Sequence, residues 1–273
     1  MNKTWRFVGL ALLATAVLAT VGMAQEVSFK DPVGDDNGPG AYTYPTDNVY
    51  KPGSFDLTFF KMKASGGKYQ LDFGVNAQLE DKCWSMQYGF CVQMLLVFVK
   101  ADPATGHTEG LPGLSVQFAK DAGWNKCIIV SPQPSTRVKS EIELKVAKGL
   151  QPDIIVPDHV RGAGRTISAW VDAKDLPAGD ITKWGYQVIM QSNEGFPDKD
   201  ALLTRGVNEF EGQHRFGGGN DSHCNPQVMD ILAGNGTGDK SEADLQHKML
   251  AYECNPDGTV KSMATLTMVY LKK

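Results

Sequence analysis

The sequence predicts an all-β protein, a β-sandwich with one or two short helices. Three observations predict this class: short segments alternate between apolar and polar residues, glycine and proline are frequent at 29 and 14 of 273 residues, and helical periodicity is weak. Short alternating segments joined by turn-forming residues are typical of β-sandwiches. We therefore expect about ten strands with turn-rich connections.

The clearest predicted strand covers residues 69–79, where every second residue is apolar. Such alternation indicates one buried and one solvated face. Residues 55–63 predict a neighbouring strand, and Gly66 and Gly67 between the two predict a hairpin turn, because paired glycines accept positive φ. Residues 138–146 alternate just as regularly and predict another strand. The remaining predicted strands are residues 92–100, 113–118, 126–130, 166–172, 184–191 and 264–271.

Helical structure is expected in two places. Residues 241–251 fit a short helix, with Ser241 as its N-cap and Asp244 as the capping partner three residues on. Residues 171–177 fit a single helical turn. Residues 192–262 otherwise hold few strand patterns and many Gly, Asn and Asp residues, so we interpret them as a long functional or capping excursion on the sandwich.

The chain begins with the features of a secretory signal peptide. Two basic residues precede an uncharged apolar run over residues 7–21, and small residues then lead to Ala24. The apolar run is shorter than the roughly 20 residues of a membrane-spanning helix. We expect residues 1–24 to be removed, leaving residues 25–273 as one secreted, periplasmic or cell-surface domain with no membrane span.

Charge restricts the classes of partner. The net charge is −4 for the whole chain, and removing the two basic residues of the leader makes it −6. A mildly acidic chain without a basic cluster argues against nucleic acid as a partner. The same charge argues against docking on anionic lipid.

Five cysteines, at positions 83, 91, 127, 224 and 254, are read first as disulfide formers, because the chain is expected to be exported. Cys224 and Cys254 each precede Asn-Pro, and we expect them to pair. Cys83 with Cys91 is the second expected pair, which leaves Cys127 free. Spacing alone does not fix this connectivity. The chain lacks the Cys-x-x-Cys pattern of zinc sites and the Cys-x-x-Cys-His pattern of c-type haem attachment.

The most informative segment is an acidic loop over residues 31–57. Asp31, Asp35, Asp36 and Asn37 concentrate oxygen atoms among glycines. Calcium prefers six to eight oxygen ligands, and glycines let backbone carbonyls turn inward. The spacing does not match an EF-hand, and a polar turn is the alternative interpretation.

This loop resembles a known family. From residue 31 it reads Asp-Pro-x-Gly-Asp-Asp-x-Gly-Pro-Gly-x-Tyr-x-Tyr-Pro-Thr, and residues 52–57 read Pro-Gly-x-Phe-Asp-Leu. Both motifs are similar to the C-terminal binding module of glucodextranase, and segments beginning at residues 184, 216 and 226 support the match. The resemblance implies an immunoglobulin-like or jelly-roll sandwich related to carbohydrate-binding modules and to DOMON-type domains. It also implies attachment to polysaccharide or to the cell surface.

The resemblance further implies a calcium site, with its ligands among the carboxylates of this loop and Asp230. Asp35, Asp36 and Asp56 are the first expected ligands, followed by Asp31 and Asp230. Carboxylates are ligands that calcium prefers.

Sugar-binding sites place aromatic faces against the apolar side of a pyranose ring, with polar groups alongside. Aromatic residues in predicted loops are therefore candidate ligand-binding platforms. The alternative is that these rings pack against the sandwich, since most large aromatics are at least partly buried. The candidates are Tyr42, Tyr44, Tyr50, Trp84, Tyr88 and Trp124.

These observations favour an exported, non-catalytic module that binds polysaccharide or cell-envelope glycan and is stabilised by calcium. The chain contains neither Gly-x-Ser-x-Gly nor His-Glu-x-x-His, two motifs of hydrolytic enzymes. One alternative is an accessory subunit of a glucan-degrading enzyme, with a glycoside hydrolase as its partner. Another is a glycosidase, although the strand-borne pair Glu141 and Glu143 is better explained as a solvated face.

A third alternative is an electron-transfer protein with b-type haem, as in DOMON relatives, with methionine, histidine or lysine as the iron ligand. The candidate methionines are Met62, Met86, Met94 and Met190. The group His214, His223 and Cys224 matches no standard transition-metal spacing. The glycines at 217–219 fit a tight bend better than an anion-binding nest.

Overall fold

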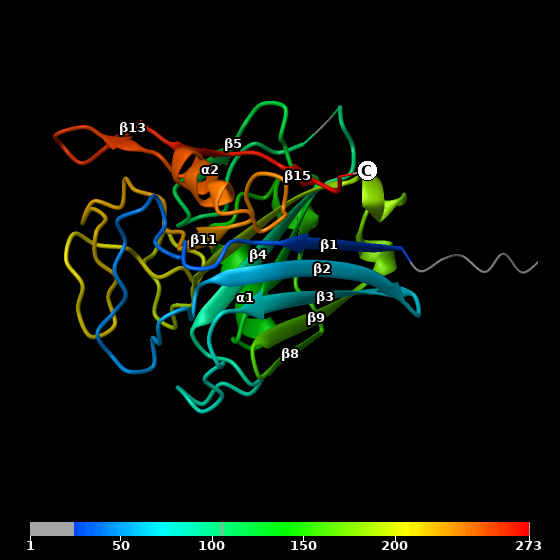
Figure 1. Ribbon diagram of the computed structural model, residues 1–273, viewed down its shortest axis with the longest axis horizontal. Helices are drawn as coiled ribbons and strands as arrows, with labels where there is room; N and C mark the ends of the chain where they lie inside the picture. The colour runs from blue at the N-terminus through cyan, green and yellow to red at the C-terminus, as the bar shows by residue number, and fades with distance from the viewer. Residues whose placement is uncertain (1–24, 105, 273) are drawn as a thin grey trace, which may run out of the picture.

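The computed structural model describes residues 25–104 and 106–272, so the expected signal peptide and its cleavage after Ala24 lie outside the described residues. Two β-sheets pack face to face and enclose a hydrophobic core (Figure 1). This arrangement confirms the all-β sandwich predicted from the sequence. Within the described ranges, no helix combines the length and the apolar character needed to cross a membrane.

The first sheet is antiparallel and has the strand order β1-β2-β3-β9-β8. Burial alternates along β9, because one face points to the core and the other to solvent. The hairpin predicted between β2 and β3 is present, with Gly66 and Gly67 both at positive φ, where glycine meets no steric penalty. The strands are β1 (Glu26–Lys30), β2 (Leu57–Ser65), β3 (Lys68–Val75), β8 (His159–Ala163) and β9 (Thr166–Asp172).

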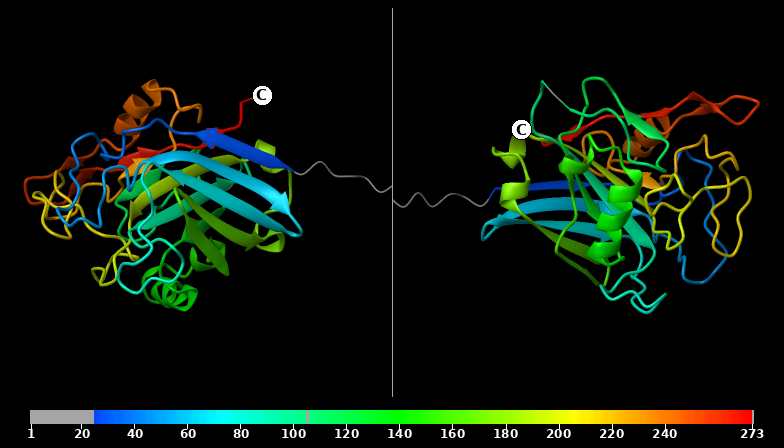
Figure 2. Two further views of the ribbon diagram at one scale, coloured as in Figure 1. Left: turned by 60° about the horizontal axis from the view of Figure 1, so that its bottom comes forward. Right: turned by 180° about the vertical axis from the view of Figure 1, so that it is seen from behind.

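The second sheet has the order β11-β10-β4-β6-β7, and β15 adds beside β10. Every residue of β4 and β10 is buried. One face of these strands packs on the first sheet, and helix α1 (Ser135–Lys145) lies against the other face (Figure 2). The strands are β4 (Gln93–Lys100), β6 (Lys126–Val130), β7 (Ile154–Ile155), β10 (Gly185–Ser192), β11 (Asp230–Ile231) and β15 (Val269–Tyr270).

The strand predicted over residues 138–146 is wrong, because most of this segment belongs to α1. Val138 and Ile142 lie one helical turn apart and are buried against the second sheet. Leu144, which a strand would place on the same face, is 76% exposed. Positions 138, 142 and 146 fit a helical spacing of four as well as a strand spacing of two, so the pattern was ambiguous.

The C-terminal third contains the excursion expected for residues 192–262. It holds β11, helix α2 (Ser241–Met249) and the hairpin of β12 (Glu253–Cys254) and β13 (Val260–Ser262). Ser241 is the first residue of α2 and not its N-cap, because Lys240 occupies that position, and the Ser241 hydroxyl donates to Asp239 Oδ1 at 2.6 Å. The predicted strand 264–271 is divided into β14 (Ala264–Leu266) and β15, and β14 pairs in parallel with β5 (Val116–Phe118).

Three short 3₁₀ turns complete the described secondary structure. They are η1 (Gln151–Asp153), η2 (Ala173–Asp175) and η3 (Ile181–Lys183). The second of them is the single helical turn predicted within residues 171–177.

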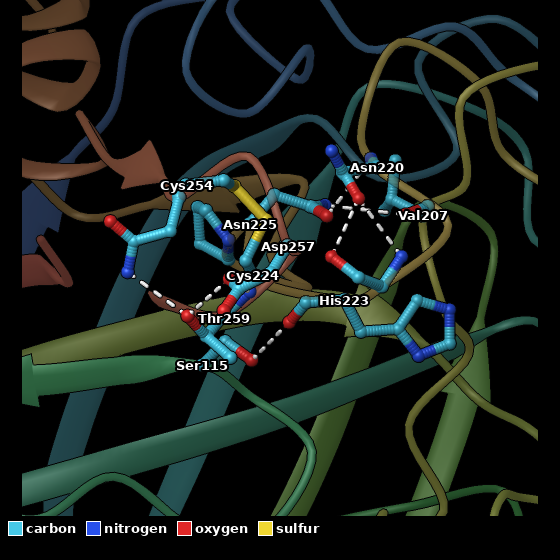
Figure 3. Close-up of a disulfide and its surroundings, with 12 residues drawn as sticks. Ser115, Val207, Asn220, His223, Cys224, Asn225, Cys254, Asp257 and Thr259 are labelled. Atoms are coloured by element: carbon cyan, nitrogen blue, oxygen red, sulfur yellow. Dashed lines mark hydrogen bonds between the residues drawn. A yellow bond between two sulfur atoms is a disulfide. The ribbon is translucent and has the colours of Figure 1, made fainter. Parts of the chain in front are cut away.

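Both expected disulfides are present, Cys83–Cys91 and Cys224–Cys254, and Cys127 is free and buried. The second bridge fastens the β12–β13 hairpin to the loop before β11 (Figure 3). Beside it, the Ser115 hydroxyl donates to the His223 carbonyl at 3.0 Å (Figure 3). The disulfide closes the excursion on itself, and the Ser115 bond holds it against the segment that leads into β5.

Candidate metal centre and aromatic surfaces

Three buried aspartates meet where the two sheets approach each other. Asp31 directly follows β1, Asp35 lies four residues later in the acidic loop, and Asp230 begins β11. Each offers one carboxylate oxygen, and these oxygens lie within 4.8 Å of one another. The fold therefore brings together carboxylates that are about 200 residues apart in sequence.

Most carboxylate oxygens of this group and of the neighbouring Asp56 lack a hydrogen-bond donor among the described residues. Both oxygens of Asp31 and of Asp35 are buried without a partner, as are Oδ1 of Asp56 and Oδ1 of Asp230. The two satisfied oxygens accept from backbone and amide groups. Asp56 Oδ2 receives Gly34 N at 2.8 Å and Asn76 Nδ2 at 3.0 Å, and Asp230 Oδ2 receives Leu57 N at 2.6 Å. Buried carboxylates without donors are costly unless a cation or a proton neutralises them.

The acidity of the group reflects this crowding. Burial, and then the negative charges of Asp35 and Asp56, raise the pKa of Asp31 well above its usual value. Burial and the charge of Asp31 do the same for Asp230. Burial raises the pKa of Asp35 to about 7 and that of Asp56 to about 6, and neighbouring carboxylates add to both shifts. Without a cation, the site keeps its negative charge only at a cost in stability.

Asp36, expected among the first metal ligands, lies outside the group formed by Asp31, Asp35 and Asp230. Its Oδ2 accepts a hydrogen bond from the Tyr44 hydroxyl, which itself accepts Phe55 N at 2.9 Å. Asp36 therefore ties the two ends of the acidic loop together. Asp56 also lies outside this group. However, its Oδ1 is buried without a hydrogen-bond partner, and its negative charge helps to raise the pKa of Asp31.

Helix α2 closes the site through residues that sequence reasoning missed. Gln246 Nε2 donates to the Asp35 carbonyl, and Gln246 Oε1 accepts Ile231 N at 2.8 Å. One buried amide side chain thus joins the acidic loop to β11. On the next residue, His247 Nε2 lies 3.2 Å from Asn37 Oδ1.

Glu242 anchors the start of the same helix. Its carboxylate accepts the backbone N–H groups of Asn235, Thr237 and Gly238 at 2.8–3.1 Å. The turn that presents these amides contains Gly234, Gly236 and Gly238 at positive φ. The sequence pattern that could have predicted this contact is the series of alternating glycines before a glutamate. Successive backbone N–H groups in such a turn form a nest that binds an anion.

The structure corrects the expected set of aromatic platforms. Tyr42, Tyr50 and Trp124 are buried, so their faces are not available to a sugar. The Tyr42 hydroxyl donates to the Pro226 carbonyl at 2.7 Å, and Trp124 Nε1 donates to the Glu109 carbonyl at 2.8 Å. These rings pack the loops onto the sandwich, which was the alternative interpretation. Trp84 is 44% exposed.

Most of the other candidate catalytic, haem and transition-metal residues are held in ion pairs, in the core or in a disulfide. Glu141 lies on α1, where its carboxylate contacts Arg137 at 2.8 Å and Lys145 at 2.9 Å, whereas Glu143 is exposed. Three of the candidate haem ligands, Met62, Met94 and Met190, are fully buried in the core. Cys224 is oxidised in a disulfide, so the His214, His223 and Cys224 group has no thiolate for a metal.

The glycine run at 217–219 is a close-packed connection. Gly217 pairs with Thr43, and a Cβ at Gly218 would meet the Ala41 carbonyl oxygen at 2.1 Å. Small residues are required here because two backbones lie in contact. This arrangement agrees with the tight-bend interpretation.

Comparison with protein families identifies a match over most of the chain. The family described as the C-terminal, SLH-like binding module of glucodextranase matches residues 27–269. No curated protein matches the chain.

Proposed function

The chain belongs to the family of C-terminal, SLH-like binding modules of glucodextranase, and from this membership we propose that it is an exported, non-catalytic glycan-binding module stabilised by calcium. Its ligand is a polysaccharide or a glycan of the cell envelope, and its place is the cell surface. Two disulfides in the described chain support an oxidising compartment. A glycoside hydrolase is the natural partner for such a module, by analogy with the enzyme that names the family.

The observation that carries the calcium assignment is the buried group of Asp31, Asp35 and Asp230. Its unpartnered carboxylate oxygens match the hard oxygen ligands that calcium selects. The group contains no histidine or thiolate, which softer transition metals favour. Asp56 Oδ1 is available as a further ligand, and bound calcium would supply the positive charge that these carboxylates lack.

The same geometry argues against hydrolysis at these carboxylates. Asp31 is 4% exposed and Asp230 is fully buried, so a substrate cannot reach an acid–base pair there. Glu141 is held in two ion pairs on α1. A non-catalytic role explains both arrangements.

The metal assignment is tested by calorimetric titration of calcium into the chelator-treated mature chain. We expect one tight site, and Asp31→Asn should weaken binding at least tenfold because it removes a charged ligand. Glu143→Gln is the matched control, since it removes one negative charge from an exposed helix position. Equal calcium affinity in both variants would refute the assignment.

A further inference from the structure

A groove of about 500 Å³ opens beside the Cys83–Cys91 loop. Its volume lies within the range of about 300–1,000 Å³ that is common for small-molecule sites. Two aromatic rings and one thioether, Trp84, Phe196 and Met86, form its apolar surface. Its polar surface includes Glu194, Arg205 and His214.

The apolar surface is exposed to an unusual degree. Phe196 is 96% exposed and Trp84 is 44% exposed, and both line the same groove. Neighbouring apolar side chains that remain in water mark interaction sites more often than isolated ones do. The two rings come from separate loops, so the fold brings them together across the groove.

Trp84 is held in place before any ligand arrives. The disulfide closes its loop, and Trp84 and Ser85 both adopt positive φ, at 50° and 59°, which is uncommon for residues other than glycine. The indole ring lies 6.1 Å from the Tyr50 ring and 6.0 Å from the His214 ring, measured between centroids. A preorganised aromatic ring loses little conformational freedom on binding.

The charged groups of the groove neutralise each other. Arg205 Nη1 lies 2.8 Å from Glu194 Oε2, and both side chains are largely buried. The same guanidinium donates to the His214 carbonyl at 2.6 Å and lies 5.7 Å from the Tyr50 ring centroid. A charged ligand would have to break or oppose this pair, whereas hydroxyl groups can share its remaining hydrogen-bonding capacity.

We propose that this groove is the glycan-combining site and that it takes neutral pyranose units. The apolar face of a sugar ring lies on Trp84, Phe196 encloses it from the opposite loop, and its hydroxyls bond to the Glu194–Arg205 pair. Stacking beside a rigid polar edge is the combination that distinguishes a pyranose from a purely apolar molecule. This inference rests on the proposed glycan-binding function and assigns it to particular residues.

The test measures binding of the calcium-loaded mature chain by affinity electrophoresis and calorimetry. The probes are maltoheptaose, isomaltoheptaose and laminarin as neutral glucans, with polygalacturonate as an acidic comparator. We expect the native chain to bind a neutral glucan in preference to polygalacturonate. Trp84→Ala and Phe196→Ala should each raise the dissociation constant about tenfold, equivalent to about 1.4 kcal/mol.

Two matched controls separate the groove from other surfaces. Phe210→Ala removes another exposed phenylalanine, and Trp170→Ala removes the indole that pairs with His159 on the open face of the first sheet. Both controls should keep native affinity. Because Phe196 is almost fully exposed, its replacement should leave the thermal midpoint unchanged, so lost binding would not reflect unfolding.

The outcomes distinguish the two proposals. If the native chain binds glucan and both groove variants bind equally well, the groove assignment is overturned while glycan binding stands. Loss of binding in Trp170→Ala alone would place the site on the open face of the first sheet. A preference for polygalacturonate would contradict the proposal that the ligand is neutral. A native chain that binds none of the four polymers would count against the proposed function itself.

Discussion

At the scale of single residues, two neighbouring carboxylates of the acidic loop make different contacts. Asp35 and Asp36 are adjacent and chemically alike, yet one points into the buried group and the other to Tyr44. Direction depends on backbone angles within an irregular loop, which composition does not specify. The aromatic residues show the same limitation: a loop position predicts nothing about burial, so Trp124 became core and Trp84 stayed exposed.

The raised pKa values of the aspartates predict how stability depends on pH. The ordinary value is 3.8, whereas folding raises that of Asp35 to about 7 and that of Asp56 to about 6. The metal-free folded chain therefore holds protons that the unfolded chain has released, and its stability falls as pH rises from about 4 to 7. The proposed calcium ion would bind the deprotonated carboxylates, so its stabilising effect should grow over the same window.

Thermal unfolding in chelator should accordingly give a higher midpoint at about pH 5 than at about pH 7.5. Excess calcium should reduce or reverse this difference. Asp230→Asn, with one buried carboxylate fewer, should show a weaker pH dependence in chelator. A midpoint that rises with pH in chelator would contradict the expected titration.

The cysteines give a second prediction at residue scale. Burial raises the pKa of the Cys127 thiol well above its usual value, and a buried thiol reacts poorly because the thiolate is the nucleophile. The native chain should show almost no reaction with a thiol reagent such as dithionitrobenzoate. In denaturant without reductant, one thiol per chain should react; three or five would show that one or both disulfides are absent.

At the scale of elements, strands were predictable in two situations. In one, a buried face alternates with a solvated face, and in the other, both faces of the strand are buried. The strands β6 and β9 match their predicted bounds. Helix α1 was not predictable, because positions 138, 142 and 146 satisfy both periods and only the exposure of Leu144 decides between them. The local sequence pattern also predicted the position of α2. It did not predict that α2 contacts the acidic loop, because Gln246 bonds to residues more than ten positions away in sequence.

Helix α2 should stabilise the proposed metal centre through Gln246. The Gln246→Ala variant leaves the Ile231 N–H buried without a partner, and it removes one of the two donors to the Asp35 carbonyl, which keeps its bond from Asn37 N. An unsatisfied buried group costs about 1–3 kcal/mol. We expect a lower thermal midpoint and weaker calcium binding in calorimetry. Lys248→Ala, at an exposed position on the same helix, is the control and should behave like the native chain. If calcium affinity is unchanged in Gln246→Ala, the helix does not support the site.

At the scale of the whole molecule, the acidic loop connects the proposed metal and glycan sites. Tyr44 and Tyr50 both lie in this loop and both contact the Phe55 ring, at centroid distances of 5.3 and 6.4 Å. Tyr50 continues to Trp84 at the groove, and Tyr44 hydrogen-bonds to Asp36 beside the metal centre. An ordered loop is therefore a shared requirement of both sites.

Calcium should consequently stabilise the sandwich as a unit. Asp31 continues from the first sheet and Asp230 belongs to the second, so a bound ion would cross-link the two sheets. At one hundred times its dissociation constant, a ligand adds about 2.7 kcal/mol to folding. For a chain of this size that corresponds to a rise of about 5–10 °C in the thermal midpoint.

Differential scanning calorimetry should show this rise in one cooperative transition, and chelator should abolish it and weaken glucan binding. Asp31→Asn should show a smaller rise at the same calcium concentration because its affinity is lower, whereas Glu143→Gln should respond like the native chain. An early calcium-dependent transition limited to part of the enthalpy would show that the ion orders the loop alone and does not join the sheets.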